Sequence, residues 1–334
     1  MGYIFHFCFY YDSGFFILRY SASVEYDGTN FFGWQRQSKV NSIQEEIENS
    51  LSKILLKDIK IQGAGRTDTG VHALGQIFHF DTDVDRPINS LIKGINSFLP
   101  NAIRIKWIVG VSNDFHARFS ATSREYQYLL FNSPINSSIW SNHCGWTYYK
   151  LDLKLVISAS KKFEGSHDFS AFRSSECQAK SPIRFVKKIT VEKFNDFYLF
   201  TINADGFLHH QIRNMIATII NVGRGEMAVD YIDTLFQKKD RSLTPATFSP
   251  NGLYLTNIKY DKIWGLPDKL NTLIILLMAV KTIGVYHVLP EFLRFQAPLI
   301  TLMKCFWKRQ SMRPSLAVLA MRLIFVAIKC DFCK

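Results

Sequence analysis

A ten-residue loop, GAGRTDTGVH at residues 63–72, holds the residue types best suited to chemistry. Its glycines allow a sharp backbone turn and the close approach of a bulky substrate. Asp68 follows Arg66 by two residues, so the guanidinium can keep the carboxylate ionised and aim it. Such a carboxylate can act as a nucleophile or as a base, whereas in an ordinary turn it would only accept local N–H groups. The spacing alone leaves both interpretations open.

The segments around this loop predict alternating strands and helices. Strands are expected at residues 21–27, 58–62 and 76–80, so the loop joins two of them. Ser42 and Glu45 form a capping box that opens a helix with apolar residues at helical spacing. A second helix is expected between the prolines at positions 87 and 100.

The second half of the chain repeats this mixture. A strand is predicted at 124–131, a helix capped by Asp152, and a hairpin of residues 184–193 and 197–204. A last helix carries an apolar stripe from Leu208 to Ile219. The pattern predicts the α+β class, with two α/β lobes of mainly antiparallel strands on either side of a central cleft.

We expect four segments along the chain. Residues 1–20 form an extension of unknown role, 21–135 the lobe with Asp68, 136–264 the lobe with Arg213, and 265–334 an apolar, basic extension. The lobes are expected to meet near residues 134–149, a Ser- and Asn-rich stretch with little periodicity.

The two end segments carry no strong functional signal. Residues 1–20 lack a basic start and a small-residue cleavage site, which argues against a signal peptide. The apolar runs 272–280 and 315–328 are too short or too interrupted to span a bilayer, although a membrane-surface hairpin stays possible. Cys330 and Cys333 have no partner pair nearby, so neither a zinc nor a redox site is expected.

Composition and charge restrict the class of protein. With 47% hydrophobic residues and six cysteines among 334, the chain is neither disordered nor a disulfide scaffold, and a reduced cytoplasmic setting is expected. The net charge of +12 suggests a polyanionic partner such as nucleic acid. About +7 of it falls in residues 265–334, so the signal is weaker for the main body.

Five motifs together resemble the tRNA pseudouridine synthase A family. They are YDGTNFFGWQRQ at 26–37, GRTDTGVHA at 65–73, DFHARFSATSREYQY at 114–128, FLHHQIRN at 207–214 and GLYL at 252–255. Their order and spacing match over residues 20–264, about three quarters of the chain. The resemblance implies the pseudouridine synthase fold and a cofactor-free, metal-free isomerisation of uridine to pseudouridine in tRNA.

The resemblance also implies roles for individual residues. Asp68 matches the essential catalytic aspartate, and Arg213 matches its basic partner. Tyr126 matches a tyrosine that stacks on the detached uracil, and Leu255 matches an apolar position lining the uracil pocket. Arg66 matches an arginine that helps to displace the target base from its stack, as an RNA duplex requires.

Simpler roles stay open for four of these residues. Tyr126 and Leu255 would also suit a packed core, and Arg213 would suit a surface or phosphate contact. Arg66 would equally suit a phosphate contact. Histidines tempt a metal interpretation, but no H-E-x-x-H spacing exists, and His209 and His210 are expected on a helix, pointing in different directions. RNA contacts or structural hydrogen bonds are expected for them instead, as for His72 and His116.

The expected partner is tRNA, bound at its anticodon stem-loop. Basic residues that would contact its phosphates are Arg36, Arg118, Arg124, Lys161, Lys162, Arg173, Arg184, Lys187 and Lys188. The resemblance implies modification at nucleotides 38, 39 and 40 and a homodimer. The alternative is a module that binds or folds tRNA without chemistry. A second alternative is a membrane-associated form anchored by residues 271–334.

Overall fold

The computed structural model describes residues 17–267. Most of the two predicted end segments, including both apolar runs and the terminal cysteine pair, lies outside this range. The strands are β1 (Leu18–Tyr26), β2 (Ile61–Gly63), β3 (His72–Thr82), β4 (Ile103–Val111), β5 (Ala121–Asn132), β6 (Gly145–Thr147), β7 (Gly165–Asp168), β8 (Ile183–Phe194), β9 (Phe197–Ala204) and β10 (Leu253–Tyr260). The helices are α1 (Ile43–Leu55), α2 (Ile88–Phe98), α3 (Leu153–Lys161), α4 (Gln211–Gly223) and α5 (Tyr231–Lys238), with 3₁₀ turns at Ser170–Phe172, Arg241–Leu243 and Lys262–Trp264.

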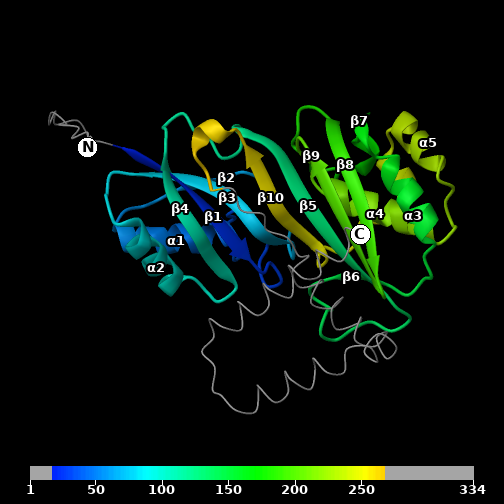
Figure 1. The fold of residues 1–334 in the computed structure, drawn as a ribbon, viewed down its shortest axis with the longest axis horizontal. Coiled ribbons are helices and arrows are strands. Elements are labelled where there is room, and N and C mark those ends of the chain that lie inside the picture. The colour runs from blue at the N-terminus through cyan, green and yellow to red at the C-terminus, as the bar shows by residue number, and fades with distance from the viewer. Residues whose placement is uncertain (1–16, 268–334) are drawn as a thin grey trace, which may run out of the picture. The chain divides into compact units, whose positions relative to one another are not determined.

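The strands form one ten-stranded sheet (Figure 1). Its order is β4-β1-β3-β10-β5-β9-β8-β7, with β2 paired to β3 and β6 paired to β5. All strand pairs are antiparallel except β3 with β10 and β5 with β6. The predicted α+β class with mainly antiparallel pairing is therefore confirmed.

The strand that comes last in the sequence, β10, lies at the centre of the sheet. β10 is parallel to β3 on one side and antiparallel to β5 on the other, so it joins the two halves of the chain (Figure 1). The predicted segments placed this strand in the second lobe. The division into lobes at residue 135 stays a prediction, but the hydrogen bonding across it is continuous.

Local signals account for the ends of two helices. Ser42 accepts a hydrogen bond from the Glu45 N–H at 3.3 Å, and Asp152 accepts from the N–H groups of Lys154 and Leu155. These caps satisfy amide groups that the first helical turn leaves unpaired. Both predicted helix starts are confirmed.

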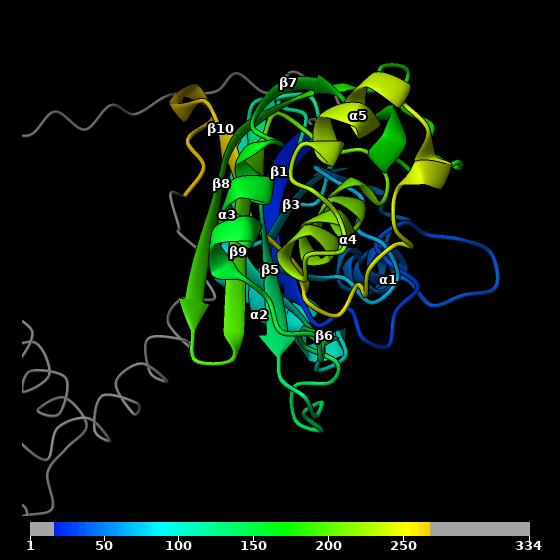
Figure 2. The same ribbon diagram turned by 90° about the vertical axis from the view of Figure 1, so that its right-hand side faces the viewer.

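The helices cover the sheet with apolar faces. The stripe Ile43, Ile47, Leu51 and Leu55 of α1 is buried, and nearly every residue of α4 is buried. Figure 2 shows α1 and α4 on the same side of the sheet. One helix from each half of the chain is thereby packed on the same side of the sheet. Within residues 17–267, no helix has the length and hydropathy needed to span a membrane.

Candidate active site

The loop that carries Asp68 runs from β2 to β3 and is held by hydrogen bonds to its backbone and to Thr67. The Tyr26 hydroxyl and Thr67 Oγ1 lie 2.8 Å apart, and the Trp34 N–H donates to the Thr67 carbonyl at 3.0 Å. Gln76 donates from its side-chain amide to the Gly65 carbonyl at 2.6 Å. Tyr26 and Trp34 belong to the YDGTNFFGWQRQ motif, so this motif helps to fix the loop that carries Asp68.

Gly33 shows why this motif needs glycine. Its φ of +79° lies in the left-handed region, and a Cβ there would come within 2.5 Å of the Thr67 carbonyl oxygen. Any side chain would push the two loops apart and move the residue that precedes Asp68.

Arg213 reaches Asp68 from the first turn of α4. Its Nη1 donates to Asp68 Oδ2 at 2.9 Å, while its Nε donates to the Phe248 carbonyl at 2.8 Å. The two side chains are only 13% and 18% exposed, so water screens the pair weakly. The predicted pairing of the two residues, 145 positions apart, is present in the structure.

Two histidines also face the Asp68 carboxylate, contrary to the sequence prediction. His209 Nε2 lies 3.3 Å from Oδ1, and His210 Nε2 lies 3.5 Å from Oδ2. Both residues precede α4, and His210 adopts the left-handed conformation with φ of 63°. The prediction that they point in different directions assumed helical backbone and is wrong, because the chain turns before Gln211.

The surroundings of Asp68 favour its charged form. Burial raises the pKa of this carboxyl, but the His209 hydrogen bond, the His210 charge and the Arg213 guanidinium together lower it below its ordinary value. The same hydrogen bond raises the pKa of His209, whereas burial lowers the pKa of His210. Asp68 is therefore ionised at neutral pH and available as a nucleophile or base.

Tyr126 and Leu255 lie side by side on neighbouring strands. They are directly paired across β5 and β10, so their side chains share one face of the sheet. Tyr126 is 8% exposed, packs edge-on against Phe207, and has a hydroxyl 3.9 Å from where a Cβ of Gly65 would stand. Burial, reinforced by the Asp68 charge, raises the pKa of the Tyr126 hydroxyl, which stays protonated.

Arg66 and the predicted basic contacts differ in how freely they can meet RNA. Arg66 is exposed, and among the described residues it forms no ion pair. Arg36 pairs with Glu48, Lys162 with Asp233, and Arg124 donates to several backbone carbonyls. Arg36, Lys162 and Arg124 are therefore already engaged in contacts within the fold.

His209→Gln should flatten the pH dependence of stability. Because pairing with Asp68 raises the pKa of His209 in the folded state, its stabilisation is complete below about pH 6.5, the ordinary histidine pKa, and is lost as pH rises through the folded value. The thermal midpoint of the variant should fall less than that of the wild type on going from pH 6 to 8. In an Asp68→Asn background, adding His209→Gln should leave the change of the thermal midpoint with pH unaltered. If His209→Gln alone has the same pH dependence as the wild type, the pairing with Asp68 is contradicted.

Tyr126→Phe should keep the fold and slow the reaction. Phenylalanine retains the packing against Phe207, and among the described residues the hydroxyl has no hydrogen-bond partner to lose. If the hydroxyl transfers a proton, turnover should fall about 100-fold. Single-turnover rates and tRNA affinity, measured together, check this, and an unchanged rate would restrict Tyr126 to stacking.

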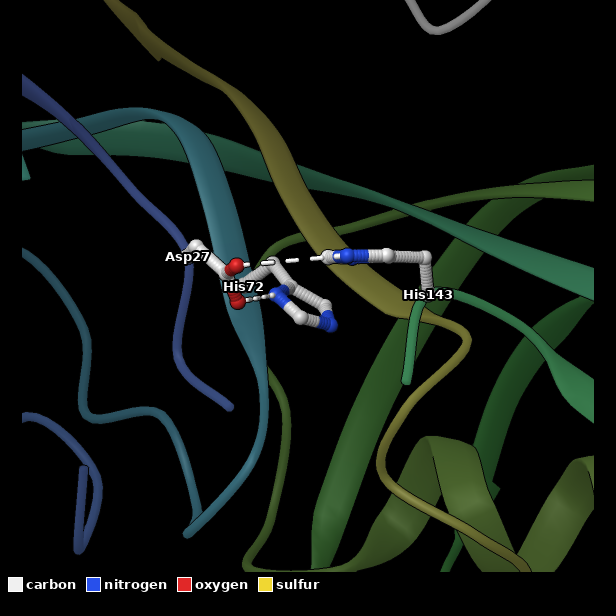
Figure 3. Close-up of side chains that lie close together, drawn as sticks. All are labelled: Asp27, His72 and His143. Carbon is white, nitrogen blue, oxygen red and sulfur yellow. Dashed lines mark ion pairs between the residues drawn. The ribbon is translucent and has the colours of Figure 1, made fainter. Parts of the chain in front are cut away.

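A second group with histidines lies at the start of β3. His72 Nδ1 is 3.1 Å from Asp27 Oδ1, and His143 Nε2 is 4.0 Å from Asp27 Oδ2 (Figure 3). His72 Nε2 lies 3.1 Å from the carbonyls of both Asn142 and Asn251, which makes it the protonated ring nitrogen. This group ties the loops at 27, 142 and 251 to the end of the Asp68 loop.

Each histidine group has three side chains that could offer atoms to a metal ion. In the first group the Arg213 guanidinium already binds Asp68 Oδ2, and its positive charge opposes a cation there. In the second group His72 Nδ1 lies 3.1 Å from both the Gly28 nitrogen and Asp27 Oδ1, and Nε2 faces two backbone carbonyls. Asp68 Oδ2 and both ring nitrogens of His72 thus already have protein neighbours.

Sequence reasoning missed His209 and His210 as partners of Asp68, and Thr67 and Gln76 as supports of its loop. His209 and His210 lie four and three residues before Arg213, about one helical turn away, and this spacing was a usable signal that they lie near the same carboxylate. The left-handed turn at His210 has no comparable signal in the sequence.

Known proteins resemble this chain over most of the described range. The family model for tRNA pseudouridine synthase matches residues 22–120 and 159–261. A tRNA pseudouridine synthase A from Dechloromonas aromatica is 42% identical over 75% of this chain and 96% of its own length. One from Nitrosomonas eutropha is 45% identical over 73% of this chain and 88% of its own length.

A solved Cbf5–Nop10–Gar1 complex contains a more distant match, 14% identical with a TM-score of 0.31 over 71% of this chain and 58% of that one. The resemblance stated from the five motifs is confirmed by the family model and by the two relatives. Their extent and identity establish that this chain belongs to the tRNA pseudouridine synthase family, whose members isomerise uridines of tRNA.

Proposed function

We propose that this chain forms pseudouridine at nucleotides 38, 39 and 40 of the tRNA anticodon arm, with Asp68 as the essential carboxylate. One observation carries the assignment of the residue. Asp68 is an ionised, largely buried carboxylate held by Arg213, and a Cβ at Gly65 in the same loop would meet nothing nearer than the Tyr126 hydroxyl at 3.9 Å. A pure tRNA-binding module would gain nothing from burying this charge.

The reaction gives each group a task. The bond between N1 of uracil and C1′ of ribose breaks, the base turns, and C5 bonds to C1′ while its proton leaves and N1 gains one. Asp68 serves this exchange as a nucleophile or as the base that removes a proton. Tyr126 and Leu255 offer a stacking ring and an apolar wall to the detached uracil.

Arg66 is proposed to act before chemistry begins. Its exposed guanidinium stands two residues from Asp68, at the place where a uridine leaving its stack would pass. It can fill the vacated space or contact the backbone phosphate. The family resemblance further supports a cytoplasmic homodimer, which light scattering on the purified chain would test.

The reaction is tested with tRNA transcript tritiated at C5 of uridine. Because C5 loses its hydrogen when it bonds to ribose, tritium release counts turnover. Mapping pseudouridine by nucleotide then reports whether positions 38, 39 and 40 are modified. Pseudouridine found at other nucleotides would correct the proposed positions in the tRNA. Binding of tRNA without any tritium release would favour the non-catalytic module.

A further inference from the structure

A cavity of about 690 Å³ opens beside the candidate active site, with His210 in its lining. Its lining includes Arg173, Ser174, His210, Lys239, Arg241 and Thr247. His210 is shared, because its Nε2 lies 3.5 Å from Asp68 Oδ2. The Ser174 N–H also donates to the His209 carbonyl at 2.9 Å, so the cavity wall is bonded to the segment that faces Asp68.

The cations of this cavity are not equivalent. Lys239 Nζ pairs with Asp168 Oδ2 at 2.9 Å. The terminal nitrogens of Arg241 donate to Asn214, Thr247 and the Pro245 carbonyl, so this guanidinium builds the wall. Half-buried Arg173, in contrast, has no side-chain hydrogen bond or ion pair among residues 17–267.

A half-buried arginine without a partner, in a cavity that also offers hydroxyls, is suited to a phosphate. Guanidinium binds phosphate oxygens with two parallel hydrogen bonds, and serine and threonine hydroxyls add further donors. The one acidic residue in the lining, Asp240, is turned to the Ser242 N–H and hydroxyl at 2.8 and 2.7 Å. Both bonds go to Oδ1 of Asp240, and the lining holds three cations, Arg173, Lys239 and Arg241, against this one carboxylate.

We propose that this cavity binds the phosphodiester next to the target uridine, with Arg173 as its cation. This inference rests on the proposed function, since it takes the uridine at Asp68 as the reference point. His210 borders both Asp68 and the cavity, so a nucleotide whose sugar lies at Asp68 can lead its backbone past His210 into the cavity. Arg173 would thereby position the uridine and is not itself a catalytic residue.

The test combines Arg173→Ala with full-length tRNA that carries one neutral methylphosphonate, placed on the 5′ or the 3′ side of the target uridine. On unmodified tRNA the variant should lose about 10- to 100-fold in kcat/KM, the effect of a charged hydrogen bond. One of the two methylphosphonates neutralises the phosphate that Arg173 contacts. On that tRNA the variant and the wild type should have the same kcat/KM. Arg173→Lys should recover part of the loss.

Two controls keep the outcome decisive. Arg86→Ala removes an exposed arginine before α2, outside the cavity. Its kcat/KM should fall equally little on the unmodified tRNA and on the two methylphosphonate tRNAs. tRNA affinity measured in parallel gives the same comparison independently of turnover. A loss for Arg173→Ala that persists at both neutral linkages, or no loss at all, would overturn the proposal. Absence of tritium release from the wild type would instead refute the proposed function.

Discussion

Asp68→Asn should abolish pseudouridine formation while leaving tRNA affinity within about tenfold of the wild type. Asparagine keeps the size of the side chain and an oxygen that can accept from Arg213, but it is neither a nucleophile nor a base. Because the lost charge acts on the chemical step, we expect turnover to fall on the order of 10⁴-fold or more. Single-turnover tritium release and equilibrium binding to the same transcript measure the two quantities.

A matched control separates this effect from a general loss of negative charge. Asp58 is 77% exposed, and its one ion pair within residues 17–267 is with Lys60, so Asp58→Asn should change neither turnover nor affinity. Turnover of the Asp68 variant close to that of this control would exclude Asp68 as the essential carboxylate. A large drop in affinity with an unchanged rate for bound tRNA would assign Asp68 to binding instead.

The sequence was most informative where function and local structure coincide. Asp68, Tyr126, Arg213 and Leu255 were placed by motif, and the structure brings Asp68 to Arg213 and Tyr126 to Leu255. The helix starts at Ser42 and Asp152 were readable because capping is a local interaction between neighbouring residues.

What could not be predicted depends on contacts between distant residues. Nothing near residue 253 indicates that its strand inserts between β3 and β5, since this register is set by the partners on both sides. The two histidines at Asp68 were missed because a single left-handed residue redirects them. The contacts of Tyr26 and Trp34 with Thr67 join positions more than thirty residues apart, so the motif alone could not reveal its supporting role.

Arg213→Ala should give the second large effect, on stability and on turnover together. It leaves Asp68 largely buried without its guanidinium, and it leaves the Phe248 carbonyl without a donor. Breaking such a buried pair costs about 3 kcal/mol of unfolding free energy. We expect turnover of the folded variant to drop about 100-fold, because a mispositioned carboxylate meets the nucleoside less often in the reactive geometry.

The pH profile distinguishes positioning by Arg213 from a purely structural role. Since Arg213 helps to lower the pKa of Asp68, its removal should raise that pKa and move the acidic limb of the rate profile to higher pH. Arg213→Lys should recover more stability than turnover, because lysine supplies charge without the paired donors that hold both Asp68 and Phe248. Arg19→Ala, which breaks the more exposed pair with Asp81, should lower stability without moving the limb. An unshifted limb in folded Arg213→Ala would show that the guanidinium does not control the Asp68 charge.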